Sequence, residues 1–304
     1  MPQLMVQNGK FIDYEDALVH VMSPAMKYGF SVFEGVRAYW NDRDNQLYVF
    51  RMRDHTDRLF QSMKLLRFQP TFDKDEIDRL TLELLRQNEI KSSGAVRVCA
   101  YVDGRGEQES RSPIGYVISA TAKGRDTAIV EKGIRAQVSS WIRIADNSMP
   151  PRIKTAANYV NTSLARVQAT HDGYGDAILL NQAGKVSEAS GSTLFMVRRG
   201  KVVTPDLTSA VLESITRDTI LQLAVQAGFE IEEREVEKTE LYAAEEIFFC
   251  GSAAEVKPVI DVDGMIIGTG EPGPITRHLQ NDYFAAVSGA RADNKGWLTP
   301  VLTS

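Results

Sequence analysis

Short apolar runs alternate with polar turns at the start of the chain, a pattern typical of β-strands. Asn8-Gly9 stands between Leu4-Met5-Val6 and Lys10-Phe11-Ile12. Both residues of this dipeptide tolerate a positive φ, which a two-residue type I′ turn requires. We therefore predict a hairpin here, and the run Leu47-Tyr48-Val49-Phe50 predicts a further strand.

A helical spacing of apolar residues follows. Leu59, Met63 and Leu66 stand at i, i+4 and i+7, which places them on one face of a helix over residues 54–68. The same kind of spacing predicts a second helix over 73–90. These two segments are the strongest helix signals in the first part of the chain.

Two apolar segments, 95–102 and 115–122, predict strands that follow these helices. The first part of the chain thus combines strands with helices, as in an α+β layer arrangement. A polar run then breaks the periodicity, so we place an inter-domain linker at 123–133. It would separate a small N-terminal domain, 1–122, from a larger C-terminal domain, 134–304.

The second part of the chain again mixes the two kinds of element. Gln182-Ala183-Gly184-Lys185 predicts a turn, and Gly173 and Gly228 are plausible helix ends. We expect strands over 134–144, 176–180, 193–197 and 247–250, and helices over 155–171, 214–227 and 275–287.

Length and charge narrow the possible functions. A chain of 304 residues fits one large or two medium domains. Its net charge of −5, with the basic residues scattered, gives no electrostatic basis for binding nucleic acid or an anionic membrane. The N-terminus lacks the regions of a signal peptide, and no apolar stretch approaches the ~20 residues of a membrane helix. We expect a cytoplasmic protein.

Three further patterns argue against other kinds of site. Cys99 and Cys250 are isolated in apolar runs, which predicts buried thiols in a reducing compartment and neither a disulfide nor a metal site. Residues 268–273 match the dinucleotide fingerprint by letter, but no following strand with a ribose-binding acid is present. We interpret this segment as a Gly-Pro loop, and 261–264 as a hairpin turn.

Lys154 and Glu188 are the strongest candidates for catalysis. Lys154 comes just before a predicted helix, and Glu188 lies on a nearby predicted strand, followed by Ala-Ser-Gly-Ser. Pyridoxal phosphate chemistry needs an amine that forms a Schiff base and a carboxylate that holds a proton on the ring nitrogen. The small residues after Glu188 would let a flat ring lie against the backbone. Since most lysines are solvated, the surrounding residues carry this interpretation.

A phosphate group would need anion donors, and three places in the chain offer them. Ser214-Ile215-Thr216-Arg217 opens a predicted helix, whose first N–H groups and positive dipole end suit a phosphate. Gly251-Ser252-Ala253 follows a strand and offers a second corner of this kind. Arg58 could add a bidentate guanidinium. The Tyr159 hydroxyl could bond the ring oxygen of the cofactor, although a core tyrosine is the simpler alternative.

Taken together, these residues resemble the class IV (fold type IV) pyridoxal phosphate-dependent aminotransferases, and most of all the branched-chain amino acid aminotransferases. The resemblance runs nearly from end to end. Its blocks are His20-Val21-Met22-Ser23, Tyr28 to Arg37, Arg53-Asp54-His55 with Arg58-Leu59, Val138-Ser139-Ser140-Trp141, Lys154 with Asn158-Tyr159, Ser187-Glu188, Ile215-Thr216-Arg217, Gly251 to Glu255, and Gly273-Pro274.

The resemblance implies a fold and an assembly. The fold would be α+β, a two-domain fold type IV enzyme like D-amino acid aminotransferase. A small N-terminal α+β domain would precede a larger C-terminal domain with a β-barrel-like sheet, with pyridoxal 5'-phosphate between them. The protein would be a homodimer or a higher homo-oligomer.

It also implies a role for each matching residue. Lys154 would be the catalytic Schiff-base lysine, and Glu188 the partner of the pyridine nitrogen. The phosphate would be held by Arg58, Ile215, Thr216 and Ser252, and the ring hydroxyl would be approached by Tyr159. The apolar substrate pocket would be formed by Phe33, Tyr159 and Tyr28, the last from the partner subunit; the substrate carboxylate would be bound by Ser252, Ala253 and Arg97.

The implied activity is transamination of leucine, isoleucine and valine with 2-oxoglutarate by a ping-pong mechanism, so the partners are small amino acids and 2-oxo acids. Three positions depart from the family pattern, which usually has Asn where this chain has Thr193, Gly at Ser214 and, in many bacterial members, Tyr at Ala95. Because that tyrosine helps to bind the substrate carboxylate, Ala95 leaves open a D-amino acid or (R)-amine transaminase, alone or in addition. The sequence is also compatible with an aminodeoxychorismate lyase on the same fold or with a non-catalytic binding protein.

Overall fold

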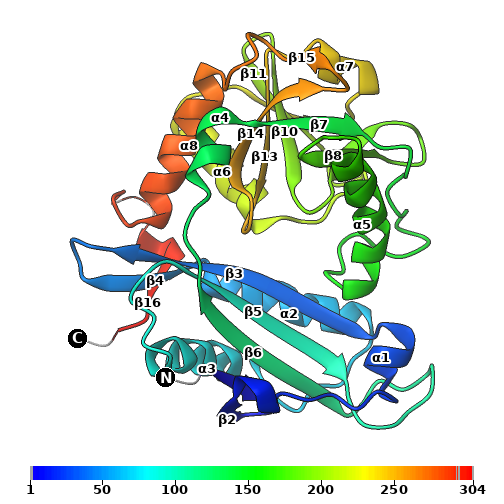
Figure 1. Ribbon diagram of the computed structural model, residues 1–304, viewed down its shortest axis with the longest axis vertical. Helices are drawn as coiled ribbons and strands as arrows, with labels where there is room; N and C mark the ends of the chain where they lie inside the picture. The colour runs from blue at the N-terminus through cyan, green and yellow to red at the C-terminus, as the bar shows by residue number, and fades with distance from the viewer. Residues whose placement is uncertain (1–2, 292, 294, 303–304) are drawn as a thin grey trace. The chain divides into compact units, whose positions relative to one another are not determined.

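The computed structural model describes residues 3–291, 293 and 295–302. Its chain forms two compact units (Figure 1). One consists of Met1–Arg125, Ile153–Ala157 and Ala285–Ser304, and the other of Asp126–Arg152 and Asn158–Phe284. Each unit therefore takes its residues from separated parts of the chain. The boundaries at 122 and 134 that the polar run suggested remain a prediction about domain organisation.

The first unit is built on an antiparallel sheet, which has seven strands among the described residues, in the order β16-β4-β3-β5-β6-β1-β2. The hairpin between β1 and β2 turns at Asn8 and Gly9, whose φ values of 50° and 81° confirm the predicted type I′ turn. The strands are β1 (Leu4–Gln7), β2 (Lys10–Asp13), β3 (Ser31–Asn41), β4 (Gln46–Phe50), β5 (Gly94–Val102), β6 (Ile114–Ala122) and β16 (Leu298–Pro300).

Helices α2 (Met52–Leu65) and α3 (Lys74–Gln87) pack on one face of this sheet. Successive side chains of a strand point to opposite faces, so β3 presents alternate residues to the helices. Val32 and Val36 join Leu59 and Met63 of α2 in one buried apolar cluster. The odd-numbered residues of β3, such as Phe33, face the other way. The short elements of this unit are η1 (Tyr14–Asp16), α1 (Pro24–Tyr28) and η2 (Lys295–Trp297).

The second unit contains a mixed sheet, with nine strands in the part of the chain that the structure describes. Its order is β12-β11-β10-β13-β14-β7-β8-β9, and β15 pairs with β14. The strands are β7 (Ile134–Val138), β8 (Asp176–Leu180), β9 (Val186–Ala189), β10 (Thr193–Arg198), β11 (Lys201–Pro205), β12 (Ile231–Arg234), β13 (Glu246–Gly251), β14 (Glu255–Val262) and β15 (Met265–Ile266).

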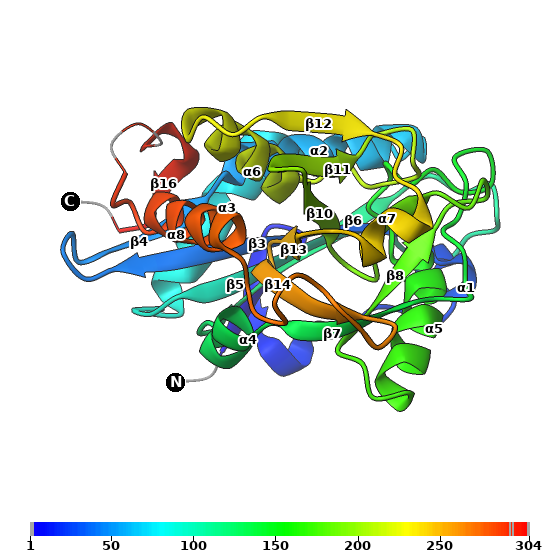
Figure 2. The same ribbon diagram turned by 90° about the horizontal axis from the view of Figure 1, so that it is seen from above.

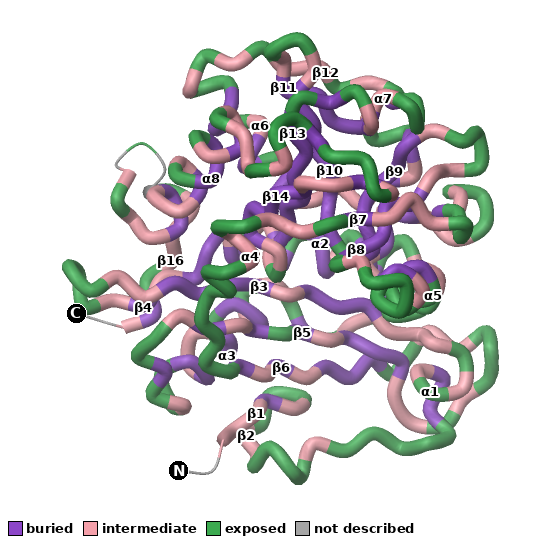
Figure 3. Tube along the Cα trace, turned by 45° about the horizontal axis from the view of Figure 1, so that its top comes forward, coloured by how far each residue is buried: buried purple, intermediate pink, exposed green. Residues whose placement is uncertain are grey.

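This second sheet curls. The pairs β11–β12, β14–β7 and β7–β8 are parallel, and Figure 2 shows β7 beside β14. At the end of the strand order, β9 also contacts β10 and β11, so the sheet closes part of the way into a barrel. The central strands β10, β13 and β14 are almost entirely buried (Figure 3). Helices in this part of the chain are α4 (Thr127–Lys132), α5 (Ala156–His171), α6 (Ile215–Gln226), α7 (Lys238–Tyr242) and α8 (Pro274–Val287).

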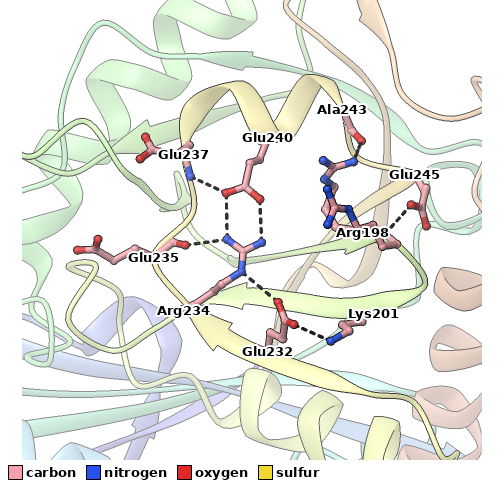
Figure 4. A network of polar contacts seen from close by, with 10 residues as sticks. Arg198, Lys201, Glu232, Arg234, Glu235, Glu237, Glu240, Ala243 and Glu245 are labelled. Carbon is pink, nitrogen blue, oxygen red and sulfur yellow. Dashed lines mark hydrogen bonds and ion pairs between the residues drawn. The ribbon is translucent and has the colours of Figure 1, made fainter.

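Charged residues cover the edge of the curled sheet (Figure 4). Arg234, at the end of edge strand β12, donates to Glu240 of α7 at 2.7 Å and to Glu232 at 3.2 Å. Lys201 of the neighbouring strand bonds Glu232 at 2.9 Å. Exposed pairs of this kind each stabilise the fold by little, about 0–1 kcal/mol. Their charge discourages another chain from pairing with the open strand edge.

Most elements expected from the apolar spacing are confirmed, including both helices of the first unit, the helix after Lys154 and the helix after Ser214. The strand expected over 134–144 is too long, because β7 ends at Val138. There the Ser139 hydroxyl accepts the N–H of Trp141 at 3.0 Å, which turns the chain out of the sheet.

The spacing of apolar residues did not predict some of the elements. Strand β3, eleven residues long, contains Glu34, Gly35 and Arg37, which break the apolar alternation. Helix α4 lies within the segment assigned to the linker, where three residues, Ala128, Ile129 and Val130, give too short a pattern to detect. The sequence signal fails in both places because tertiary pairing, and not local spacing, stabilises the element.

The thiols and glycine-rich segments largely behave as expected. Cys250 is fully buried, and burial raises the pKa of its thiol; Cys99 is also free but only half-buried, so the prediction of a buried thiol there is wrong. Residues 268–273 form the loop before α8, and positive φ at Asp263 and Gly264 confirms the hairpin turn between β14 and β15. None of the helices in the described ranges is long and apolar enough to cross a membrane.

Gly273 predicts a measurable effect on stability. A Cβ at this position would overlap the carboxylate group of Glu246, which is buried and caps α8 by accepting the N–H groups of Ile275 and Thr276 at 3.0 and 2.6 Å. Gly273→Ala should therefore lower the free energy of unfolding by about 1–3 kcal/mol. Urea denaturation measures this, with Gly124→Ala as the control, because a Cβ at Gly124 meets no atom within 4 Å. Equal stability of the two variants would contradict the prediction.

Candidate active site

Helix α2 and strand β3 bond the backbone of Lys154 on both sides. Its N–H donates to the Ser62 hydroxyl of α2 at 3.2 Å, and its carbonyl accepts the N–H of Phe33 of β3 at 2.9 Å. The next residue, Thr155, bridges to Val32 as a short extension of the sheet. Lys154 therefore starts from a fixed backbone, two residues before α5 begins, as the sequence predicted for an amine at a helix entrance.

The half-buried side chain of Lys154 lies beside an aromatic ring that a second cation also contacts. Its Nζ is 5.1 Å from the centroid of the Phe33 ring, and the guanidinium carbon of Arg97 is 4.0 Å from the same centroid. Strand register explains the grouping, because Phe33 pairs with Cys99 and Gly35 pairs with Arg97 between β3 and β5. Three residues that the sequence singled out are thus brought together: Lys154, Phe33 and Arg97.

The same register places Ala95 directly opposite Arg37. Arg37 is buried and donates to the carbonyl of Gly124 at 3.4 Å. It shares its sheet face with Phe33, since odd-numbered residues of β3 alternate with those that face the helices. The position where the family resemblance led us to expect a tyrosine therefore lies beside a buried guanidinium that sequence analysis did not assign to the site.

On the helix-covered face of β3, Arg58 forms a buried ion pair with Glu34. Arg58 Nε donates to Oε1 at 2.8 Å and Nη2 to Oε2 at 2.7 Å, while His55 Nδ1 lies 2.7 Å from Oε2. The exposed fractions of Arg58, Glu34 and His55 are 8%, 1% and 3%, so this cluster excludes water. Glu34 and His55 stand in the family blocks of the sequence, but sequence analysis gave them no role; the signal for one is the rule that a buried charge needs a partner.

Burial and charge set the ionisation of this cluster. Burial raises the pKa of Glu34, but the Arg58 guanidinium and the His55 hydrogen bond outweigh it and lower the pKa to about 2. Burial lowers the pKa of His55 despite the attraction of Glu34. At neutral pH we therefore assign an ionised Glu34 and a neutral His55 whose Nδ1–H donates to it.

In the second unit, Glu188 lies on β9 as predicted and is buried. Arg143 donates to Glu188 Oε1 from Nε at 2.9 Å and from Nη2 at 2.8 Å. Oε2 accepts the N–H of Leu212 at 3.2 Å. Each carboxylate oxygen has two lone pairs, so Oε2 can accept a further hydrogen bond. Arg143 was missed because only its position beside a buried carboxylate, and no motif in the sequence, identifies it.

Leu212, whose N–H donates to Glu188, lies just before the start of α6. Ser214 caps this helix by accepting the N–H of Arg217 at 3.1 Å. Ile215 and Thr216 are the first helical residues, at the end where backbone N–H groups point outward along the helix axis. Arg217 has a structural role, because its Nη2 donates to the carbonyl of Pro205 at 3.0 Å and to Glu233 at 2.7 Å.

Each of the remaining candidate residues lies in a single turn or helix. Ser252 and Ala253 form the turn between β13 and β14, with Ala253 exposed. Tyr159 lies in the first turn of α5 and is 37% exposed. Tyr28 ends α1 and donates to Glu107 at 2.9 Å. Within the described residues, no cluster of His, Cys, Asp or Glu could hold a metal ion.

Comparison with known proteins now decides the family. The family model described as amino-transferase class IV matches residues 31–262. The chain belongs to the class IV aminotransferases. The fold, an α+β layer followed by a curled, half-closed sheet, agrees with this membership and confirms the predicted fold class.

Relatives and solved structures match the chain along nearly its whole length. A probable branched-chain-amino-acid aminotransferase of Aquifex aeolicus is 40% identical, over 96% of this chain and 95% of that protein. The branched-chain aminotransferase of Thermoproteus uzoniensis, solved with norvaline, has a TM-score of 0.95 and 38% identity and covers 99% of this chain and 100% of that one. The branched-chain amino acid aminotransferase of Thermobaculum terrenum in its PLP form has a TM-score of 0.94 and 40% identity, over 99% of both chains.

The buried cluster of Glu34, His55 and Arg58 predicts how stability depends on pH. Glu34 has its pKa lowered from 4.5 to about 2, so its contribution is complete above pH 4.5 and is lost as pH falls toward 2. His55, whose pKa is lowered from 6.5, contributes in the same direction, because only the unfolded chain binds its proton as pH falls below 6.5.

Glu34→Gln should therefore be less stable than the parent at pH 7 and should lose less stability on acidification from pH 5 to pH 3, by about 2 kcal/mol. Urea unfolding of both proteins at pH 7, 5 and 3 measures this difference. Two parallel stability curves would show that Glu34 does not titrate as assigned.

Proposed function

We propose that this chain transfers the amino group of branched-chain L-amino acids to 2-oxoglutarate, with pyridoxal 5'-phosphate as its cofactor and a ping-pong cycle. The observation that carries the proposal is the placement of Lys154. An amine on a backbone bonded at both its N–H and its carbonyl, beside the Phe33 ring that Arg97 also contacts, is what a covalent cofactor anchor requires. The near full-length likeness to branched-chain aminotransferases supports the substrate class.

The residues present fit this cofactor on two observations. Glu188 is a buried carboxylate, oriented by Arg143 and with a lone pair to spare on Oε2, and so is suited to a protonated ring nitrogen. The start of α6 offers N–H donors to a phosphate, which the positive end of a helix of twelve residues favours. When bound, pyridoxal 5'-phosphate supplies an electron sink for the electrons left at the substrate α-carbon.

Each residue then has a defined task. Lys154 would hold the cofactor covalently through Nζ and, once the amino acid has displaced it, would accept the α-proton at Nζ and give it back. Glu188 would keep a proton on the ring nitrogen. The remaining assignments are Arg58, Ile215, Thr216 and Ser252 to the phosphate, and Tyr159 to the ring hydroxyl.

We propose that one group of residues contacts the side chain of the substrate and another group its carboxylate. Phe33, Tyr159 and Tyr28, the last from a partner subunit, would form the apolar pocket, and Arg97 with the N–H groups of Ser252 and Ala253 would bind the carboxylate. The Arg97 guanidinium and the Lys154 amine both make cation–π contacts with the Phe33 ring. This arrangement suits a small amino acid with an apolar side chain and a carboxylate.

We extend the proposal to assembly and location, where it rests on the family resemblance: a homodimer or higher homo-oligomer that works in the cytoplasm. Two free cysteines are consistent with a reducing compartment.

Removal of the Lys154 amine should abolish turnover without unfolding the protein. We expect Lys154→Ala to lose at least ~1,000-fold in kcat, since a general base and a covalent anchor are removed together. Borohydride reduction with pyridoxal 5'-phosphate, followed by peptide mapping, should label Lys154 in the parent. Lys185→Ala is the control, because Lys185 lies on the surface and pairs with Glu237. Near-parental activity of Lys154→Ala would contradict the mechanism.

Initial rates with three amino donors test the substrate assignment. With 2-oxoglutarate as acceptor, we expect L-leucine to react faster than D-alanine and an (R)-arylamine, because the chain shares its length and fold with branched-chain aminotransferases. Faster reaction of D-alanine or the (R)-amine would instead support the alternative that Ala95 left open.

A further inference from the structure

One face of α2 makes two separate sets of contacts. His55, Arg58 and Ser62 stand at i, i+3 and i+7, so they lie on the same side of the helix. All three are buried. The first two contact Glu34 of β3, whereas Ser62 contacts Lys154. Polar residues on a buried helix face reduce apolar burial, so this concentration needs an explanation beyond packing.

The Ser62 contact fixes where the Lys154 side chain starts. Ser62 is 0% exposed, and its hydroxyl accepts the Lys154 N–H at 3.2 Å. The carbonyl of Lys154 is bonded to β3 through Phe33. Loss of the Ser62 hydroxyl would leave one side of this backbone segment without its partner. The Cα atom of Lys154 would then be less constrained, and the position of its Nζ would be less well defined.

The Glu34 contact fixes the direction of the Arg58 guanidinium. Two parallel N–H···O bonds of 2.8 and 2.7 Å define its plane, and the His55 hydrogen bond in turn holds the carboxylate. Glu34 follows Phe33 on β3. One helix and one strand thus hold both the lysine and the arginine.

We propose that Ser62 and Glu34 are positioning residues for the two ends of the cofactor, Ser62 through Lys154 at the aldehyde end and Glu34 through Arg58 at the phosphate end. This inference rests on the proposed function, in which Lys154 and Arg58 hold those two groups. Neither Ser62 nor Glu34 needs to touch the cofactor for this role.

Three related compounds separate the two ends. Pyridoxal 5'-phosphate has both the aldehyde and the phosphate, pyridoxamine 5'-phosphate lacks the aldehyde, and pyridoxal lacks the phosphate. Their dissociation constants are measured by equilibrium dialysis on the full-length protein after removal of its cofactor. Borohydride labelling of Lys154 by pyridoxal 5'-phosphate in the parent is measured in parallel. The readout is binding and does not depend on turnover.

The two variants should show opposite patterns. Ser62→Ala should weaken both aldehydes by ~5-fold, the effect of one neutral hydrogen bond, and leave pyridoxamine 5'-phosphate within about 2-fold of the parent. Glu34→Gln should weaken both phosphates by ~10-fold, because a charge-assisted bidentate pair is lost, and leave pyridoxal within about 2-fold. If Glu34→Gln does not fold, Glu34→Asp tests the same contact, since it keeps the charge but cannot keep the bidentate geometry.

Thr56→Ala is the matched control. Thr56 is another buried hydroxyl on α2, but it donates to Asp78 of α3 and not toward β3 or Lys154. Its removal should affect all three compounds equally. Equal losses for all three compounds in Ser62→Ala or Glu34→Gln, or no loss at all, would overturn the inference. Failure of the parent to bind pyridoxal 5'-phosphate, or labelling of another residue, would instead overturn the proposed function from which the inference starts.

Discussion

A carboxylate taken out of water must be paired, and this requirement organises both units of the protein. Glu34 is buried under α2 and is paired with Arg58, while Glu188 is buried on β9 and paired with Arg143. An unpaired charge at either position would cost several kcal/mol. The pairing therefore fixes the orientation of two arginines and two carboxylates before any ligand binds, and all four groups belong to the proposed function or its support.

Strand β3 connects this electrostatic constraint to the candidate chemistry. Its even-numbered residues face α2 and supply the apolar cluster and Glu34; its odd-numbered residues present Phe33 on the opposite face, toward Lys154 and Arg97. Because the side-chain period of a strand is two, a slip of one residue would exchange these faces. The antiparallel register between β3 and β5 and the buried ion pair between Glu34 and Arg58 therefore depend on each other.

Several parts of the site could be predicted from the sequence, because they depend on local patterns. Lys154 before a helix, Glu188 on a strand and Ser214 before α6 follow from apolar spacing and capping residues. Glu34, Ser62 and Arg143 could not be predicted in this way. Their importance comes from partners distant in sequence, as in the bond between Ser62 and Lys154, and no periodicity records such a partner.

By itself, the amino-acid sequence determined the class of chemistry, the order of most elements and the family, because residue types and short spacings carry that information. The tertiary structure decided which groups are buried together. It extended β3 through residues that break the apolar alternation, ended β7 at Val138, and placed residues 153–157 against β3 of the first unit. The physical reason is that burial and hydrogen bonding act between residues that are close in space, whatever their separation along the chain.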